Sequence, residues 1–441
     1  MKTKERQSVQ TQAFDKQSGT PTGEIPEGWE ENFFSEVVDV NPKRELRKEA
    51  VSKFVSMAGL KEFNKKIQRF TVRKFSSGSK FINGDTLMAR ITPCLENGKT
   101  AFVDILENGE VGCGSTEFIV LCGKDGKSTS QFVYYLTTSP HIREKAIKSM
   151  IGTSGRQRVE SNVFEKLIVN LPTLAEQHAI AKILSDLDEK IELNHRMNKT
   201  LEAIAQAIFK RWFIDFNFPN EKGPPYKDSG GRMVDSEPGE IPVGWAIQQI
   251  SDCGEVICGK TPPTADKDNY GDDIFFITIP DMRDQAFVIQ TERKLSQKGS
   301  SLQKKKELPP FAICVSCIAT PGLVSLTSDV SHTNQQINSI VCKKDFSPYF
   351  MYCTMLGASE EVKSMGLGGT ATLNLNAGDF SRMKVLVPDY STMNLFHENV
   401  GPLMARVLEN SRENMNLSQI RDSLLPKLMS GRIRVGSENL K

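Results

Sequence analysis

The longest regular hydrophobic patterns of the chain follow Pro172 and Pro388. In both stretches apolar residues recur at alternating steps of four and three, the heptad spacing of a helix that pairs with another helix. The sequence therefore predicts two long helices that share one seam. The residues expected on this seam are Ile180, Leu184, Leu187, Ile191, Asn194, Asn198 and Leu201 in the first helix, and Phe396, Val400, Leu403, Val407, Asn410, Asn414 and Leu417 in the second.

Two asparagines interrupt each seam, Asn194 and Asn198 in the first and Asn410 and Asn414 in the second. A buried asparagine weakens a helix pair but fixes its register and orientation. We therefore expect an antiparallel pair in which asparagine faces asparagine. Helices of about 40 residues span about 60 Å at 1.5 Å per residue, enough to separate two domains. The alternative is two independent amphipathic helices, each packed on its own domain.

The chain is an internal duplication. The segment Gly23–Trp29 recurs as Gly239–Trp245, with an offset of 216 residues. The same offset relates Asn198–Leu201 to Asn414–Leu417, at the other end of each half. Because one spacing holds across most of each half, we expect the two halves to share one fold.

Each half begins with a Gly–Trp motif, continues through short strand-like runs such as Glu117–Leu121 and Gln336–Val341, and closes with a proline and a long helix. We expect an α+β fold with two domains of the same kind, each a mixed twisted β-sheet with short helices, separated by two long helices that form an antiparallel coiled coil. The expected boundaries are a flexible tail at 1–23, a first domain at 24–172, a long helix at 173–217, a linker at 218–238, a second domain at 239–388, a long helix at 389–435 and a tail at 436–441.

The length of 441 residues is too great for one ordinary domain. Apolar runs stay well short of the roughly 20 residues that a membrane helix requires. Nine cysteines and a polar N-terminus without a secretory signal predict free thiols in a reducing compartment, so we expect a cytoplasmic protein.

The net charge of +2 identifies no partner, but basic residues cluster locally. Residues 41–80 hold twelve Lys or Arg against three Asp or Glu, and residues 293–306 hold six basic residues and no acidic one. Such segments suit a polyanion such as nucleic acid. The alternative is a solvated surface whose charge is balanced elsewhere.

Two motifs look catalytic. Gly254–Thr261 matches the phosphate-loop pattern, whose chemistry needs a helix that begins at Lys260 and Thr261. Pro262 and Pro263 follow at once, and the second proline opposes a helix there. We therefore interpret the segment as a turn or a DNA-facing loop.

Asp281, Glu292 and Lys294 resemble a nuclease pattern in which two acids hold Mg²⁺. The pattern is short, and the first half has no acids at the matching positions. Cys314 and Cys317 lack the two further ligands that a zinc site requires, so we expect structural thiols and no metal.

Several segments resemble the specificity subunits of type I restriction–modification systems. They are Gly84–Pro93 and Gly114–Val120 in the first half, Phe213–Trp245 in the centre, and Gly259–Pro262 and Asn334–Gln336 in the second half. The resemblance implies that each domain reads one part of a split, asymmetric DNA site and that the paired helices set the gap. It also implies two modification subunits that dock on the helices and methylate adenine with S-adenosylmethionine, and restriction subunits that use ATP and Mg²⁺. Catalysis would belong to those partners, and this chain would bind no cofactor.

The residues expected to contact DNA are polar or basic and lie in or beside predicted loops. They are Lys74, Lys80, Arg90, Thr92, Lys99, Thr153, Ser154, Arg156, Gln157 and Arg158 in the first half, and Lys260, Thr261, Arg283, Lys294, Thr320, Thr370 and Asn374 in the second. Each could instead be an ordinary surface residue. Two rival functions stay open: a self-contained nuclease or nucleotide hydrolase that uses one of the two motifs above, and a structural adaptor whose domains bind protein.

Overall fold

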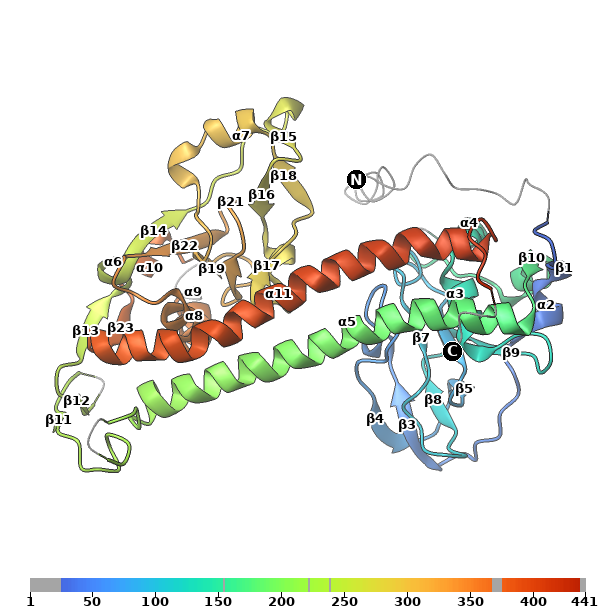
Figure 1. Cartoon of the computed structure of the whole chain (residues 1–441), viewed down its shortest axis with the longest axis horizontal. Helices are drawn as coiled ribbons and strands as arrows, with labels where there is room; N and C mark the ends of the chain where they lie inside the picture. Colours follow the sequence, from blue (N-terminus) through green and yellow to red (C-terminus); the bar gives the residue numbers. More distant parts are fainter. Residues whose placement is uncertain (1–24, 154, 221–222, 238, 367–374, 437–441) are drawn as a thin grey trace. The chain divides into compact units, whose positions relative to one another are not determined.

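The computed structural model describes residues 25–153, 155–220, 223–237, 239–366 and 375–436. The chain divides into two compact units, one formed by Met1–Glu192 with Asn416–Lys441 and the other by Leu193–Met415. We call them unit 1 and unit 2. The division falls within both long helices, α5 (Leu174–Phe209) and α11 (Tyr390–Met429), so each unit contains a part of each helix (Figure 1).

Unit 1 contains two four-stranded sheets with the orders β2-β9-β6-β7 and β4-β3-β8-β5, and a two-stranded sheet β1-β10. The first sheet is antiparallel, and the second is mixed because β3 and β8 run parallel. Their facing sides bury one apolar cluster, and α3, α4 and the long helices bury another. The elements are β1 (Glu30–Phe33), α2 (Phe34–Val37), β2 (Val38–Val40), β3 (Val51–Val55), η1 (Met57–Gly59), β4 (Thr71–Lys74), β5 (Ser79–Phe81), β6 (Thr86–Ala89), β7 (Thr100–Phe102), β8 (Gly112–Gly114), β9 (Phe118–Gly123), α3 (Ser130–Thr138), α4 (Pro140–Lys148), η2 (Ser161–Lys166) and β10 (Ile168–Leu171).

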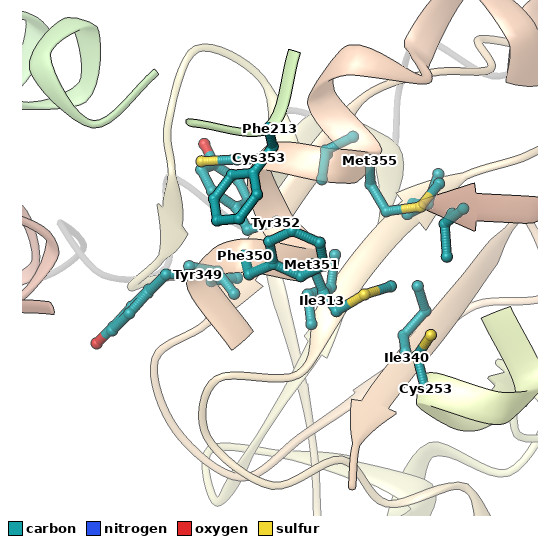
Figure 2. Packing of buried hydrophobic residues seen from close by; sticks show 14 of the residues in the cluster. Phe213, Cys253, Ile313, Ile340, Tyr349, Phe350, Met351, Tyr352, Cys353 and Met355 are labelled. Carbon is teal, nitrogen blue, oxygen red and sulfur yellow. The ribbon is translucent and has the colours of Figure 1, made fainter. Parts of the chain in front are cut away.

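Unit 2 contains a five-stranded sheet β14-β22-β19-β20-β17, a four-stranded sheet β15-β18-β16-β21 and the pairs β13-β23 and β11-β12. Helix α8 covers the larger sheet; its Met351 lies beside Ile313 of that sheet, whereas Phe350 packs against Phe213 (Figure 2). The elements are η3 (Lys210–Ile214), β11 (Met233–Val234), β12 (Ile241–Pro242), β13 (Ala246–Gln249), α6 (Ile250–Cys253), β14 (Gly254–Cys258), η4 (Lys267–Asn269), β15 (Tyr270–Gly271), β16 (Ile274–Ile277), η5 (Ile279–Met282), β17 (Phe287–Val288), β18 (Arg293–Leu295), α7 (Gln297–Ser301), η6 (Lys304–Lys306), β19 (Ile313–Ser316), β20 (Val324–Thr327), β21 (Ser331–Thr333), β22 (Ile337–Cys342), α8 (Pro348–Gly357), α9 (Ser359–Gly366), α10 (Ala377–Arg382) and β23 (Lys384–Val387).

The two units repeat one topology. The order β14-β22-β19-β20 in unit 2 matches β2-β9-β6-β7 in unit 1, and the parallel pair β16 and β21 matches β3 and β8. The predicted α+β class and duplicated domains are therefore confirmed. Each unit holds two packed sheets of four or five strands, with one or two two-stranded sheets beside them, rather than the one sheet that the sequence predicted, because the short strands separate at their turns.

The long helices pair antiparallel within each unit, as the heptad seam predicted. In unit 2 the Nδ2 of Asn194 donates to the Oδ1 of Asn414 over 2.9 Å, and the Nδ2 of Asn410 donates to the Oδ1 of Asn198 over 2.8 Å. In unit 1 the Nη1 of Arg421 lies 2.7 Å from the Oδ1 of Asp188. The asparagine layers therefore bring the two seams together in one register.

The apolar seam residues also reach the domain cores. Ile180 and Leu184 are fully buried in the core of unit 1 beside Leu428. Phe396 is fully buried in the core of unit 2, where its ring centroid lies 5.9 Å from that of Trp212. Ile191, Val400 and Val407 are also buried, whereas Leu187, Leu201, Leu403 and Leu417 are half-buried.

Both long helices end earlier than the sequence predicted. After Phe209 the chain forms the π-turn η3, in which the Asp215 amide donates to the Lys210 carbonyl, and Phe213 then enters the core of unit 2. The last helix ends at Met429 because Gly431 adopts a left-handed conformation (φ 70°), which closes the final turn.

In the part of the chain that the structure describes, no helix is long and apolar enough to cross a membrane. All nine cysteines are free thiols, and five of them are buried. The predicted tail at 1–23 and the last residues of the tail at 436–441 lie outside the described residues.

Candidate nucleic-acid interface

In unit 1 three loops meet at one edge of the antiparallel sheet. The amide of Arg90, just after β6, donates to the Glu117 carbonyl over 3.0 Å, and the Arg90 carbonyl accepts from the Val159 amide over 2.8 Å. The Thr92 amide donates to the Gln157 carbonyl over 3.0 Å. The structure therefore gathers Arg90, Thr92 and the loop at 151–158, which the sequence placed far apart. We call this set of loops the unit 1 loop edge.

Arg158 anchors this edge. Its guanidinium makes a two-pronged ion pair with Glu117, with the Nη2 to Oε1 distance 2.7 Å and the Nε to Oε2 distance 2.9 Å. The hydrogen bonds from Arg158 lower the pKa of the Glu117 carboxyl and raise the pKa of Arg158. Because its charge is already paired, Arg158 holds the loop in place and is less suited to reading a base than the sequence suggested.

Two other arginines of the edge are better placed to contact a ligand. Arg156 is exposed and makes no ion pair with the described residues, and Thr153 is exposed in the same turn. Arg90 is half-buried, and its Nε is buried without a hydrogen-bond partner among the described residues. A positioned guanidinium with unused donors can pair with phosphate or with a guanine edge.

The other predicted lysines of unit 1 are Lys99, Lys74 and Lys80. Of these three, Lys99 lies at the unit 1 loop edge. Lys99 is mostly buried, and its ammonium lies 3.4 Å from the Met57 carbonyl and 3.8 Å from Glu62. Lys74 lies on β4 in the mixed sheet, exposed, 3.4 Å from Glu49. Lys80 lies on β5 of the same sheet, over the ring of a phenylalanine. Lys99 therefore supports the loop edge, whereas Lys74 and Lys80 belong to a different surface.

Unit 2 builds the equivalent edge from different residues. The Cys317 amide donates to the Gln336 carbonyl over 2.8 Å, and the Cys317 carbonyl accepts from the Leu375 amide over 3.0 Å. These bonds repeat those of Arg90 with Glu117 and Val159. Cys317 thus stands where unit 1 has an arginine, and Gln336 stands where unit 1 has a carboxylate.

Lys260, Thr261 and Thr320 lie at this unit 2 loop edge. The Lys260 amide donates to the Thr333 carbonyl over 2.9 Å, and the Thr261 hydroxyl donates to the Oε1 of Gln335 over 2.6 Å. The Thr320 carbonyl accepts from a serine hydroxyl in its own turn. The edge is polar but carries a smaller cationic component than its counterpart.

Other predicted residues of unit 2 lie on the smaller sheet or beyond the described chain. Lys294 lies on β18 with its ammonium 5.1 Å from the centre of the Phe275 ring, and Arg283 follows η5. Ser154 of unit 1 and Thr370 and Asn374 of unit 2, all predicted to contact DNA, lie outside the described residues.

The two catalytic-looking motifs have structural explanations. Lys260 and Thr261 follow strand β14 and no helix begins there, so their amides form no phosphate cradle. The Oδ2 of Asp281 accepts from the Thr278 amide and hydroxyl, and its Oδ1 accepts from the Glu292 amide. Asp281 therefore caps a turn, and the described residues hold no group of three His, Cys, Asp or Glu that could bind a metal.

Cys314 and Cys317 are free thiols buried in unit 2. Burial raises the pKa of Cys314 to about 12 and that of Cys317 to about 11. A thiol that stays protonated and enclosed is a poor nucleophile and a poor metal ligand.

Sequence reasoning missed three kinds of residue at these edges. Glu117 and Gln335 were not selected, because acids and amides have no pattern that distinguishes a loop partner from a surface residue. Lys65 lies within the basic segment at 41–80, yet it is 5% exposed and its ammonium donates to Gln131, Tyr135 and Ser185. A lysine between polar neighbours in a basic segment gives no sign that it is buried.

The two units are related domains, each with a polar loop edge, and each contains a part of both long helices. The family profile described as "Type I restriction modification DNA specificity domain" matches residues 26–203 and 242–393, one match in each half. The chain belongs to this family, the specificity subunits of type I restriction–modification systems. It is thus the subunit for DNA target recognition and not a catalytic one.

Similar proteins agree with this assignment. The "Type I restriction enzyme HindI specificity subunit" of Haemophilus influenzae is 37% identical over 404 residues, covering 79% of this chain and 86% of that protein. The MjaIX specificity subunit of Methanocaldococcus jannaschii is 26% identical over 332 residues, 71% of each chain. The crystal structure of the type I S subunit from M. genitalium shares the fold, with a TM-score of 0.56, 16% identity and coverage of 92% of this chain and 98% of that one.

Proposed function

We propose that the two units read different parts of one split, asymmetric DNA site. The observation that supports this most directly is the unequal chemistry of two equivalent edges. Unit 1 presents Arg90 and Arg156, whereas unit 2 presents Lys260 and Thr261 around a cysteine. Since bases are read by the donors and acceptors that reach their edges, two different sets of side chains select two different half-sites.

The residues that we propose as DNA contacts are those whose polar groups are available at the loop edges. In unit 1 these are Arg90, Thr92, Arg156 and Gln157, and in unit 2 Lys260, Thr261 and Thr320. Lys74, Lys80, Arg283 and Lys294 are proposed as phosphate contacts, because they lie on or beside the mixed sheet of unit 1 and the four-stranded sheet of unit 2. Arg158 and Lys99 would act by holding the unit 1 loops.

The chain assembles with other subunits, as a specificity subunit does, and we propose their composition from the family resemblance. Two modification subunits would dock on the paired helices and methylate adenine with S-adenosylmethionine. Restriction subunits would add ATP- and Mg²⁺-dependent cleavage. The chain itself would bind none of these cofactors, which agrees with the structural roles of Lys260 and Asp281 described above.

The experiment is to map methylated adenines in a host genome with and without this chain. Expression of the chain with its modification subunits should add one split motif with a fixed gap. Arg156→Ala should reduce methylation or relax the motif, whereas the control change Lys384→Ala, at an exposed position of β23 paired with Glu237, should leave the motif intact. An unsplit motif, or unchanged methylation without the chain, would contradict the proposal.

A further inference from the structure

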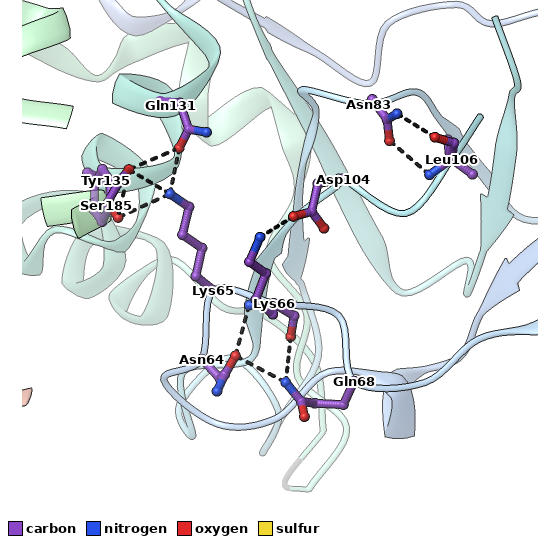
Figure 3. Close-up of polar contacts among 10 residues, drawn as sticks. All are labelled: Asn64, Lys65, Lys66, Gln68, Asn83, Asp104, Leu106, Gln131, Tyr135 and Ser185. Atoms are coloured by element: carbon purple, nitrogen blue, oxygen red, sulfur yellow. Dashed lines mark hydrogen bonds and ion pairs between the residues drawn. The ribbon is translucent and has the colours of Figure 1, made fainter. Parts of the chain in front are cut away.

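A buried polar network in unit 1 joins the loop between β3 and β4 to helices α3 and α5. The ammonium of Lys65, in the loop between β3 and β4, donates to Gln131 Oε1 over 2.5 Å and to Ser185 Oγ over 2.8 Å (Figure 3). It also lies 3.2 Å from the hydroxyl of Tyr135. Gln131 and Tyr135 lie on α3 and Ser185 lies on α5. One side chain thus ties a loop of the recognition domain to two helices.

The network continues to the second long helix. The Tyr135 hydroxyl donates to Asp188 Oδ2 over 2.7 Å, and Arg421 of α11 donates to Asp188 Oδ1 over 2.7 Å. Asp188 is 8% exposed. Tyr135 therefore accepts from the lysine and donates to the carboxylate, which links Lys65 to the Asp188–Arg421 ion pair.

The loop that carries Lys65 also touches the unit 1 loop edge. The Phe63 amide donates to the Gly98 carbonyl, and a methyl group at Gly98 would lie 2.5 Å from the Phe63 ring. The Met57 carbonyl accepts from the ammonium of Lys99. The segment 57–68 therefore contacts the loop edge at Met57 and Phe63 and the helix pair at Lys65.

Unit 2 fills the same place with apolar residues. The Ala286 carbonyl accepts from the Leu326 amide, as the Lys65 carbonyl accepts from the Phe102 amide, so Ala286 is the counterpart of Lys65. Helix α8 corresponds to α3, since Ser347 and Thr129 cap them alike. The counterparts of Gln131, Tyr135, Ser185, Asp188 and Arg421 are Tyr349, Cys353, Gly401, Met404 and Ala205.

Stability alone does not explain the polar version. A buried ionic cluster is commonly no more stable than well-packed apolar residues of similar volume. In unit 2 the counterparts lie in the apolar core, namely Ala286, Cys353, Met404 and Ala205. The fold therefore also accepts apolar residues at these positions. A polar cluster that is retained at this position in unit 1 therefore calls for a role other than holding the domain together.

We propose that the Lys65 network is a positioning device of unit 1, in which the hydrogen bonds of Lys65 hold segment 57–68, and with it the DNA-reading loop edge, in fixed relation to the helix pair. Lys65 is a positioning residue, because it contacts loops and helices and not DNA. This inference rests on the proposed function of the loop edge. At the equivalent described positions unit 2 is held by apolar packing and carries no charge that could be removed.

The network predicts a pH-dependent signature. Burial disfavours the ammonium and lowers the pKa of Lys65 to about 8. The titratable and charged groups around it, taken from every element packed against it, are Lys66, Asp104, Tyr134, Tyr135, Asp188, Glu189, Arg421 and Asp422. Raising the pH through this value removes the cost of burying the charge and should strengthen the attachment of segment 57–68, whereas a variant without the amine should not respond.

The test compares the full chain, in complex with its modification subunits, with the variants Lys65→Met and Lys65→Arg. The probe is a duplex that carries the site mapped by methylation. At about pH 7 the wild type should bind about tenfold more tightly than Lys65→Met, equivalent to about 1.4 kcal/mol, and this ratio should be larger at about pH 9.5. The Lys65→Arg variant keeps its charge at both pH values. The ratio of its DNA affinity to that of Lys65→Met should therefore change little between about pH 7 and about pH 9.5.

The control is Lys66→Met, which removes the neighbouring lysine whose partner is Asp104. Its affinity relative to the wild type should be the same at both pH values. A constant wild-type to Lys65→Met ratio across pH, or equal affinities at pH 7, would overturn the device.

A second readout needs no DNA. Amide hydrogen exchange in segment 57–68 should be faster in Lys65→Met than in the wild type at about pH 7, while the strands of unit 1 keep their protection. Unchanged exchange in this segment would also overturn the device. If the wild type showed no selective DNA binding, the proposed function would be refuted instead. Failure of the positioning device and failure of the proposed function therefore give different results.

Discussion

The asparagine layers of the helix pair allow a sharp test of how the register is held. Three full-length variants are compared: Asn410→Leu, the same-layer double variant Asn198→Leu/Asn410→Leu, and the cross-layer double variant Asn194→Leu/Asn410→Leu. The two double variants contain the same number of added leucines. They differ in whether the lost side chains were partners, and each also loses a further bond, from Asn194 to Glu413 or from Asn198 to Ser411.

The expected free energies follow from the contacts. Asn198 and Asn410 are 7% and 0% exposed and share a 2.8 Å hydrogen bond, so Asn410→Leu leaves a buried oxygen of Asn198 without its donor. An orphaned buried group of this kind costs about 1–3 kcal/mol. The cross-layer variant also breaks the 2.9 Å bond between Asn194 and Asn414 and should cost about 2–6 kcal/mol. The same-layer variant removes both partners and should be nearly neutral or stabilising.

The assay is urea unfolding of the full chain followed by the helical circular dichroism signal. Stability in the order same-layer, single, cross-layer variant is expected. If the cross-layer variant were as stable as the same-layer variant, the asparagines would contribute no pairing energy across the seam, and the register argument would be refuted.

Three further outcomes are expected. Arg156→Ala should weaken binding to the mapped duplex by about 1–3 kcal/mol in a titration if the guanidinium reads a base, and unchanged affinity would remove Arg156 from the interface. Binding of the assembled protein should fall steeply between roughly 50 and 200 mM salt, and a flat salt dependence would exclude a phosphate-contacting surface. The native pKa of Lys65, about 8, lies below its ordinary value of 10.5, so between these pH values the unfolded chain binds more protons than the native chain. The free energy of unfolding should therefore rise by up to roughly 3 kcal/mol from pH 8 to 10.5. In denaturant titrations Lys65→Met should lack this rise.

The repeat and the helix seam were predictable because both are periodic. One offset of 216 residues predicted two units of one topology. The asparagines that interrupt both seams predicted that asparagine would face asparagine, and the structure pairs Asn194 with Asn414. The ends of the long helices were less predictable. They depend on the aromatic core that takes in Phe213 and on the left-handed turn at Gly431, which are tertiary effects rather than patterns.

The candidate interface could be predicted only in part. Glycine-flanked polar loops indicated the segment that contains Arg156, and the structure places it beside Arg90. Sequence could not separate Arg156, which is exposed and without an ion pair to the described residues, from Arg158, which is paired with Glu117. The difference lies in a contact between residues 41 positions apart, and no local pattern encodes it.

The central claim is that the two units read different halves of one DNA site. Its most direct test is adenine-methylation mapping with two reciprocal variants, Arg90→Ala/Arg156→Ala in unit 1 and Lys260→Ala/Thr261→Ala in unit 2. Each variant should relax the base preference in one half of the split motif and leave the other half and the gap unchanged, and the two variants should affect opposite halves. Relaxation of both halves by one variant, or of the same half by both, would contradict the account.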